Sequence, residues 1–465
     1  MLPLEEVVRR AKLEVATVKG SELIGAHRID AEAYQREVLN AYIALARLPH
    51  VQLGEVAFIT DGQHGYHVID ETSEIKHLTA QCIRNGYVDA SNADRISAEM
   101  HARNQRSACE SGDVVLSTAG TIGSAGVVTA DVLPANMDQD LARIKIYDQH
   151  QLNPWYVATF LSSWFGRLQT GRESTGQVQQ HLALEKVRQL RIPLLDDQDA
   201  IARKAHRAFE LFRESEALYA QAQVLLTAEL GLDRLDLSEG LYSVRRSSEA
   251  LQARRIDAEY YKPRYQRLLE HIQKTGQGIR LGDWVAEPIK RGVQPEYVGD
   301  GDTVVINSQH VGKTHIVLDD NRFTSRGLYQ VGANQRAIVR QYDVLLNSTG
   351  YITIGRCQTL LDDVQAVIDG HISIIRPKEG LDPVYLAVYL NALPGQLQTE
   401  RGWTGSSGQI ELRAEVISDF VIWKAPAHTQ QQIRGLIEQS HQARREAKRL
   451  LAEARAEVER MIEAA

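Results

Sequence analysis

The stretch SELIGAHRIDAE at residues 21–32 returns as SEALQARRIDAE at residues 248–259, at an offset of 227 residues. Four further stretches return in the same order and at nearly the same offset. They are VQLGEVA from residue 51 and IRLGDWVA from 279, GDVVLSTAGTIG from 112 and YDVLLNSTGYIT from 342, LNPWYVATFL from 152 and LDPVYLAVYL from 381, and LQTGRESTGQ from 168 and LQTERGWTGSSGQ from 397. Chance does not place five matches in one order, so the chain is a tandem duplication.

The period of the duplication is about 230 residues, far longer than that of solenoid repeats, so each copy is a domain with an appended segment. The matching stretches predict a shared scaffold. The segments between them, such as 61–111 and 287–341, diverge. A shared frame with divergent inserts favours two sites that recognise two different targets.

Each copy predicts a mixed body of helices and strands. The apolar runs VVLSTAG and VLLNSTG end in Ser, Thr and Gly, which is typical of a buried strand that leads into a tight loop. Asn153 and Asp382, each followed by proline, predict helix N-caps. Helices are expected at 30–45, 153–164, 257–273 and 382–393, and strands at 142–147, 191–195, 372–377 and 420–424.

A long helix is predicted at the end of each copy, over 198–230 and 429–463, because apolar or small residues recur at alternating spacings of four and three. We expect these helices to pack antiparallel; two unrelated surface helices are the alternative. The predicted fold class is α+β, with tandem duplicated α/β target recognition domains separated by two long antiparallel coiled-coil helices. The predicted seams are Ile201, Ala205, Ala208, Phe212, Ser215, Tyr219, Ala222 and Leu226 in the first helix and Ile433, Ile437, Ser440, Arg444, Ala447, Leu451, Ala454, Val458 and Met461 in the second.

The composition is that of an ordinary globular protein, with 43% hydrophobic and 24% charged residues. The N-terminus carries acids early and no apolar run approaches about 18 residues, so neither a signal peptide nor a membrane span is expected. The three scattered cysteines, Cys82, Cys109 and Cys357, indicate structural thiols in a reducing cytoplasm. The net charge of −7 argues against a nucleic-acid binder that acts alone, unless partner subunits bind the phosphates.

This doubled order of motifs resembles the specificity (S) subunit of Type I restriction–modification systems. The resemblance is carried by GDVVLSTAGTIG and its counterpart YDVLLNSTGYITIG, by the loops Thr175–Gln177 and Ser407–Gln409, and by the helix start Asp197–Ile201. It covers residues 21–465. The chain departs from the family in its long region before Val51 and in the absence of a double proline before each long helix.

The resemblance implies a non-enzymatic subunit whose two domains each read one half of a split sequence in double-stranded DNA. The family's helices dock adenine methyltransferase subunits, expected to be two, which bind S-adenosylmethionine; an ATP-dependent endonuclease/translocase subunit joins them in some systems. No cofactor is expected on this chain. The expected domains are 1–50, an N-terminal helical segment; 51–195, target recognition domain 1; 196–230, spacer helix 1; 231–278, a linker and helical segment; 279–427, target recognition domain 2; and 428–465, spacer helix 2.

Signatures of catalysis are incomplete or absent in the sequence. Asn153–Tyr156 is similar to the Asn-Pro-Pro-Tyr signature of adenine methyltransferases, but it lacks the second proline and an upstream glycine-rich cofactor loop. No G-x-x-x-x-G-K-[ST] phosphate loop occurs, and Ser117 and Ser348 match no G-x-S-x-G elbow. His64 and His67 have a spacing that could hold a metal, but the flanking glycines predict a loop, either DNA-facing or plain surface.

Candidate DNA contacts lie in the glycine-rich loops of both copies. Phosphate contacts give affinity, and base edges give specificity, with Arg suited to guanine and Asn or Gln to adenine. Plain turns are the alternative, and Lys76, Arg84, Lys290 and Arg291 are weaker candidates. The alternative function is a coiled-coil scaffold that binds protein partners. The candidates are Thr118, Gly120, Thr121, Ser124, Gln177, Gln179 and Gln180 in the first copy and Asn347, Ser348, Thr349, Tyr351, Arg356, Ser406, Ser407 and Gln409 in the second.

Overall fold

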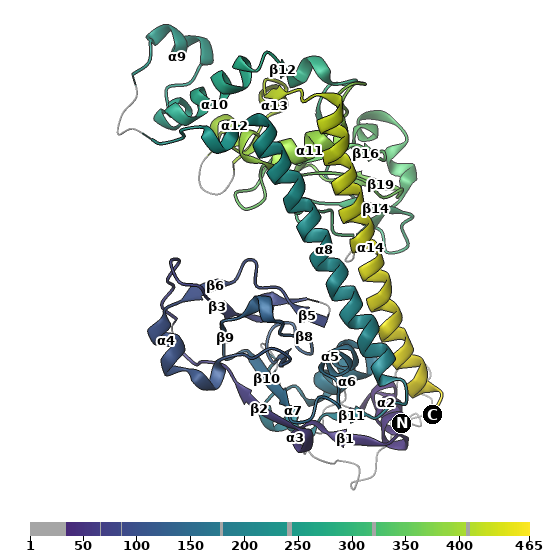
Figure 1. The fold of residues 1–465 in the computed structure, drawn as a ribbon. Coiled ribbons are helices and arrows are strands. Elements are labelled where there is room, and N and C mark those ends of the chain that lie inside the picture. The colour runs from purple at the N-terminus through teal and green to yellow at the C-terminus, as the bar shows by residue number, and fades with distance from the viewer. Residues whose placement is uncertain are drawn as a thin grey trace, which may run out of the picture. The chain divides into compact units, whose positions relative to one another are not determined.

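The computed structural model divides into two compact units, whose elements are labelled in Figure 1. The first unit comprises Met1–Phe212 and Arg445–Ala465, and the second comprises Arg213–Arg444. Each long helix is divided between the two units, and the expected domain bounds stay a prediction. The structure describes residues 34–65, 67–84, 86–176, 180–239, 244–318, 322–405 and 410–465.

The first unit combines short strands with short helices. Its strands are β1 His50–Gln52, β2 Ala57–Asp61, β3 Ile75–Leu78, β4 Ile83–Arg84, β5 Gly86–Val88, β6 Asp94–Ile96, β7 Val114–Ser117, β8 Ala125–Val127, β9 Ala135–Met137, β10 Leu141–Ile146 and β11 Arg191–Pro193. Its helices are α2 Arg36–Arg47, α3 Leu53–Val56, α4 Ala98–Arg103, α5 Pro154–Ser162, α6 Trp164–Glu173 and α7 Leu184–Gln189. The main sheet has the order β2-β10-β7-β8-β5-β4, a second sheet has the order β6-β3-β9, and β1 pairs with β11.

The second unit also combines short strands with short helices. Its strands are β12 Gly278–Arg280, β13 Lys290–Arg291, β14 Thr303–Ile306, β15 Arg322–Thr324, β16 Ile338–Val339, β17 Val344–Asn347, β18 Cys357–Thr359, β19 Ala366–Ile368, β20 Ile372–Ile375 and β21 Val421–Trp423. Its helices are α9 Ser247–Ala253, α10 Pro263–Lys274, α11 Pro383–Asn391, α12 Leu393–Gly402 and α13 Ala414–Ser418. The sheets have the orders β13-β20-β17-β18 and β15-β14-β19-β16, and β12 pairs with β21.

A four-strand order with its pairings recurs in the two units, which confirms the predicted duplication. The order β2-β10-β7-β8 corresponds to β13-β20-β17-β18, with the same antiparallel pairings. Each second sheet contains one parallel pair, β3 with β9 and β14 with β19, and an antiparallel strand beside it, β6 or β15. The sheet of the second unit has a further antiparallel strand, β16, which pairs with β19. The strands β3, β6, β14 and β15 lie inside the segments 61–111 and 287–341. These segments differ in sequence, but the common frame extends into them.

The two long helices agree with the sequence prediction. Every predicted seam residue of the first helix is buried. In the second helix Ala443 and Ile462 are buried, whereas the predicted Arg444 and Met461 are only partly buried. The prediction is wrong at these two positions because an α-helix drifts against a strict seven-residue repeat. The bounds are α8 Gln198–Leu230 and α14 Ala427–Glu463.

Within the second unit these helices pack antiparallel, as predicted. Ser440 Oγ donates a hydrogen bond to the carbonyl of Ser215 at 2.7 Å, and Thr429 Oγ1 donates to Glu229 Oε2 at 3.4 Å. Residue numbers therefore fall along one helix as they rise along the other. The buried Ala222 is one of the small side chains that let the two backbones approach closely.

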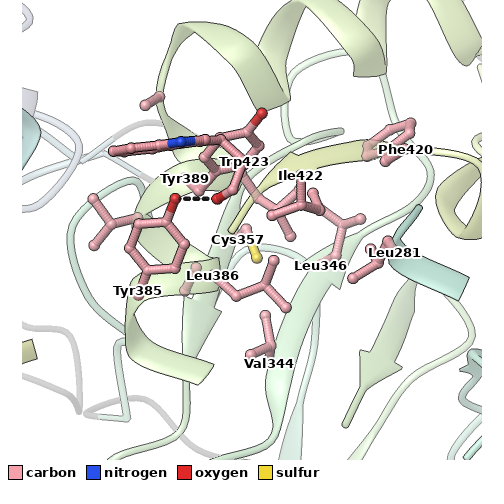
Figure 2. Packing of buried hydrophobic residues seen from close by; sticks show 14 of the residues in the cluster. Leu281, Val344, Leu346, Cys357, Tyr385, Leu386, Tyr389, Phe420, Ile422 and Trp423 are labelled. Carbon is pink, nitrogen blue, oxygen red and sulfur yellow. Dashed lines mark hydrogen bonds between the residues drawn. The ribbon is translucent and has the colours of Figure 1, made fainter. Parts of the chain in front are cut away.

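A buried tyrosine fastens a helix to the exit strand in each unit, and Figure 2 shows the second of these cores. Tyr385 on α11 donates its hydroxyl proton to the carbonyl of Trp423 on β21, within the hydrophobic cluster that also holds Leu346 of β17. In the first unit Tyr156 on α5 donates to the carbonyl of Pro193 on β11 at 2.6 Å. A tyrosine buries a large apolar ring at low cost when its hydroxyl finds an acceptor.

The predicted N-caps are confirmed. Asn153 Oδ1 accepts from the backbone N–H of Trp155 at 2.9 Å, and Asp382 Oδ1 accepts from that of Val384 at 2.8 Å, with proline in each first turn. The helix predicted over 153–164 ends at residue 162, because the backbone of Ser163 is extended and a new helix, α6, follows it.

Replacement of Gly395 by alanine is expected to lower the free energy of unfolding by about 1–3 kcal/mol, because the new methyl group overpacks a closed contact. A Cβ at this position of α12 would lie 2.2 Å from the carbonyl oxygen of Leu390. The matched control is Gly435→Ala on α14, where nothing lies within 4 Å and helix propensity favours alanine. Urea unfolding of both variants measures the difference. Equal stability of the two would contradict the close packing of α11 on α12.

Candidate nucleic-acid interface

In the first unit the two predicted loops lie side by side. The carbonyl of Thr118, after β7, accepts from the N–H of Leu182 at 2.8 Å. His181 forms bridges to both Ala119 and Thr175, so the backbone on either side of the Thr175–Gln177 motif is tied to the strand-loop. Gln177 and Gln179 lie outside the described residues.

The second unit ties its loops together in the same way. The carbonyl of Ser348, after β17, accepts from the N–H of Leu412 at 2.8 Å. Glu411 forms bridges to both Thr349 and Thr404. The candidates Ser406, Ser407 and Gln409 lie outside the described residues. The structure therefore brings together, in each unit, two loop segments that are far apart in the sequence.

Three of the candidate side chains are buried. Thr118 is 2% exposed, and Asn347 and Ser348 are 0% exposed. Asn347 Nδ2 donates to the carbonyl of Ser308 at 2.8 Å, and Ser348 Oγ donates to that of His371 at 3.1 Å. These contacts stabilise the loops from within, and a base contact through them would require the loops to open.

The remaining described candidates are accessible. Tyr351 is 71% exposed, beside Ile352 at 80%. Six more are exposed or partly exposed: Gly120, Thr121, Ser124, Gln180, Thr349 and Arg356. Contact of any candidate with DNA stays a prediction.

Glycine is required where each strand-loop closes. Gly123 and Gly355 have φ of 84° and 82°, in the left-handed region that glycine tolerates best. A Cβ on Gly123 would lie 2.4 Å from Thr170 Oγ1, and one on Gly355 would lie 2.9 Å from Thr399 Cγ2. Both loops thus lie close against a helix, α6 in the first unit and α12 in the second.

A groove of about 690 Å³ lies beside the second unit's loops, lined by Ile289–Arg291, the segment around Arg336, and 411–415. Arg291 pairs with Glu411 and donates to the carbonyl of Gly370 at 2.9 Å. The exposed cations Lys290, Arg336 and Arg413 form no ion pair within the described part of the chain. Such a concentration of cations on one concave surface suits the phosphates of nucleic acid.

Sequence reasoning named two of these cations, Lys290 and Arg291, only as weaker candidates and missed Arg336 and Arg413. A signal for Arg336 was present. The tripeptide Asn-Gln-Arg occurs at residues 104–106 and again at 334–336, inside segments that otherwise diverge. Its significance depends on the strand pairing that aligns the two inserts.

The histidines of the first insert form contacts other than a metal site. His64 Nε2 bonds to Asp61 Oδ2 at 2.7 Å, and the rings of His67 and His77 are 3.9 Å apart between centroids. The described residues include no group of three or more His, Cys, Asp or Glu side chains arranged to hold a metal ion. Burial, and secondarily the neighbouring His67, lower the pKa of His77 to about 4.

The low pKa of His77 predicts acid sensitivity of the first unit. In the unfolded chain the imidazole of His77 is protonated near pH 6.5, whereas in the folded chain its pKa is about 4. Stability is therefore present above pH 6.5 and is lost as the pH falls toward 4, by about 2 kcal/mol from this group. Urea unfolding at several pH values should show a smaller acid loss in His77→Gln. An unchanged pH profile in that variant would rule out this role.

Residues that resemble catalytic signatures have structural contacts. Asn153 caps α5 and Tyr156 is buried. The three cysteines are buried and free, and burial raises the pKa of Cys109 to about 12, which makes it a poor nucleophile. Ser117 Oγ donates to the carbonyl of Ala119 at 2.7 Å. Among the described residues, no helix is both long and apolar enough to cross a membrane.

No protein-family model matches the chain, and no curated protein matches it. Among solved structures it is similar to a Type-I restriction-modification system S subunit from M. genitalium, with 14% identity, a TM-score of 0.43, and coverage of 89% of this chain and 94% of that one. It is similar to the HsdS subunit from Thermoanaerobacter tengcongensis, with 16% identity, a TM-score of 0.26, and coverage of 90% and 94%. A chain from a structure on complex assembly and conformational transition of the type I R-M system has 17% identity, a TM-score of 0.29, and coverage of 90% and 97%.

Proposed function

We propose that this chain is the specificity subunit of a Type I restriction–modification complex, in which each unit reads one half of a split DNA target. One observation carries the proposal: a single duplicated frame presents two chemically different loop surfaces. The backbone pairings agree between the units, whereas the accessible residues on the loops differ, as at Thr121 and Tyr351. Two half-sites of different sequence require readers with equal geometry and unequal side chains.

The chemistry in this proposal belongs to partner subunits. Two adenine methyltransferase subunits that carry S-adenosylmethionine dock on the α8–α14 helices, and an ATP-dependent endonuclease/translocase joins in systems that also cut. The buried thiols and the capping role of Asn153 support a chain without catalysis of its own. Function on chromosomal or invading DNA places the complex in the cytoplasm.

The test combines binding with activity. The purified chain is expected to bind duplex DNA with an affinity that falls as salt rises, because phosphate contacts release counterions. Alone, with S-adenosylmethionine and ATP, it is expected to methylate, cut and hydrolyse nothing. Addition of its adenine methyltransferase partner should produce methylation at a split sequence. A scaffold that binds only proteins would show no salt-dependent duplex binding, and turnover that co-purifies with the chain alone would contradict a non-enzymatic role.

A further inference from the structure

The Asn-Gln-Arg tripeptides at 104–106 and 334–336 occupy one place in the common frame. The next residues run antiparallel to equivalent strands: the N–H of Cys109 donates to the carbonyl of Ala135 on β9 at 2.9 Å, and Val339 pairs with Ala366 on β19. The burial pattern from the Gln of the tripeptide through the four residues after it also agrees: Gln and Arg are exposed and the following residue is buried. Arg106 and Arg336 are therefore structural equivalents.

The residue that faces this arginine differs between the units. Asp61 at the end of β2 lies opposite Ala142 of β10, which lies opposite Leu116 of β7. Arg291 at the end of β13 lies opposite Ser373 of β20, which lies opposite Leu346 of β17, the equivalent of Leu116. Arg291 therefore occupies the same register position as Asp61. One frame position thus holds a carboxylate in the first unit and a guanidinium in the second.

This exchange changes the charge beside the tripeptide's arginine. In the first unit Arg106 Nη2 forms an ion pair with Asp61, which also bonds to His64. Burial would raise the pKa of Asp61, but the His64 hydrogen bond and the Arg106 charge together hold it below the ordinary value, so Asp61 is ionised at neutral pH.

The charges at the equivalent positions of the two units differ in number and in pairing. The position of Arg413 is held in the first unit by Ala183, and the nearby Arg188 pairs with Glu185 at 3.5 Å. Over the described residues, the charges at these first-unit positions are therefore paired. The groove of the second unit has four cations and two carboxylates, a net charge of +2: Lys290, Arg291, Arg336, Arg413, Glu411 and Glu415.

We infer that the two units contribute unequally to DNA affinity: the groove of the second unit binds backbone phosphates through Lys290, Arg336 and Arg413, and Asp61 neutralises Arg106 on the corresponding surface of the first. This inference rests on the proposed function and goes beyond it. The second unit anchors the complex on DNA, whereas the first reads its half-site with little help from phosphate attraction. The acidic net charge of the chain is consistent with a single local basic surface.

Asp61 therefore acts as a built-in limit on affinity. An exposed ion pair contributes little to stability, so Arg106 would exchange Asp61 for a phosphate at small cost. The carboxylate remains beside the site and repels the phosphate, which removes the gain. Removal of the Asp61 charge alone should convert Arg106 into a phosphate contact.

The test is a salt titration of the full chain with a short fluorescein-labelled duplex of arbitrary sequence, measured by fluorescence anisotropy. Each phosphate contact contributes about 0.9 to the slope of log affinity against log salt concentration. Arg336→Ala is expected to reduce that slope by about 1 and to weaken binding about three- to tenfold at low salt. Asp61→Asn is expected to steepen the slope by about 1 and to strengthen binding.

Two controls sharpen the result. Arg267→Ala removes an exposed arginine that pairs with Asp236 on the surface of the second unit, and it matches the change in net charge. The double variant Asp61→Asn/Arg106→Ala should return the slope to that of the wild type. Lys290→Ala and Arg413→Ala repeat the loss at separate positions in case Arg336→Ala folds poorly.

The outcomes separate this inference from the proposed function. A wild-type chain with no salt-dependent duplex binding would defeat the proposed function. Salt-dependent wild-type binding, with Arg336→Ala equal to Arg267→Ala, would leave the function standing and overturn the unequal grooves. An Asp61→Asn variant that binds like the wild type would also overturn them.

Discussion

Exchange of residues 51–195 for the first domain of another specificity subunit is expected to change one half of the recognised DNA sequence and to preserve the other half and the gap. The reason is that each unit has its own sheets and its own pair of loops. The second unit, over Arg213–Arg444, keeps every described loop contact when the first domain is replaced. Methylome sequencing of cells that carry the chimera and its methyltransferase partner measures the target.

The structure shows where to cut the chain. The N–H of Leu194 donates to the carbonyl of Pro49 at 2.7 Å, and His50 pairs with Pro193, so both junctions lie at one end of the β1–β11 ladder. Helix α2 lies before the first junction, yet it places Leu45 in the core of the same unit. A second chimera that begins at residue 34 keeps this helix with its partner surface.

The two chimeras guard against misfolding. The chimera from residue 34 is expected to express and fold at least as well as the shorter one, and both should methylate the same new target. A continuous palindromic target, or a target changed on both sides by the single exchange, would contradict two independent readers.

Replacement of Asp113 by alanine is expected to destabilise the first unit by about 3–5 kcal/mol, the usual cost of removing one partner of a buried ion pair. Asp113 precedes β7 and is 2% exposed, and its carboxylate lies 2.6 Å from Nε of Arg143 on β10. The side chain of Arg143 is 6% exposed, so the variant would bury a cation whose remaining partner, Glu110, is in solvent.

Matched variants test the cause of that loss. Glu110, the exposed partner of Arg143, has a side chain that is 59% exposed. Glu110→Ala should therefore lower the free energy of unfolding by no more than about 1 kcal/mol. The double variant Asp113→Ala/Arg143→Met should regain most of the loss, because no charge remains buried. Urea unfolding measures all three variants. If the double variant is as unstable as the single one, packing rather than the stranded charge is responsible.

A similar Asp–Arg ion pair recurs in the second unit, with the arginine just after the neighbouring strand, β20. Asp343, immediately before β17, accepts from Nε of Arg376 at 2.7 Å and from the backbone N–H of Arg340 at 2.8 Å. An ion pair between the start of one strand and the neighbouring strand thus belongs to the common frame. It stands next to the strands that end in the loops, so its loss should displace them.

The duplication, the two long helices and the helix caps were predicted from the sequence alone, and the structure confirms them. These features depend on local rules. A seam of residues such as Ile201 and Leu226 repeats with the period of the helix, and Asn153 caps a helix through a contact two residues away. Local periodicity and short-range hydrogen bonds are written directly in the order of the residues.

Only the tertiary structure decided which polar residues face solvent and which charges meet. Asn347 and Ser348 have the residue types of a DNA-binding loop, but strand pairing turns them into the interior. Asp61 and Arg106 are 45 residues apart, and the common place of the two Asn-Gln-Arg tripeptides emerges only from the pairing of β9 and β19 with their neighbours. Sheet pairing depends on contacts between distant segments, and shifting a strand by one residue exchanges its two faces. No local pattern encodes that choice, which is why the charged groove and its neutralised counterpart appear only in the folded chain.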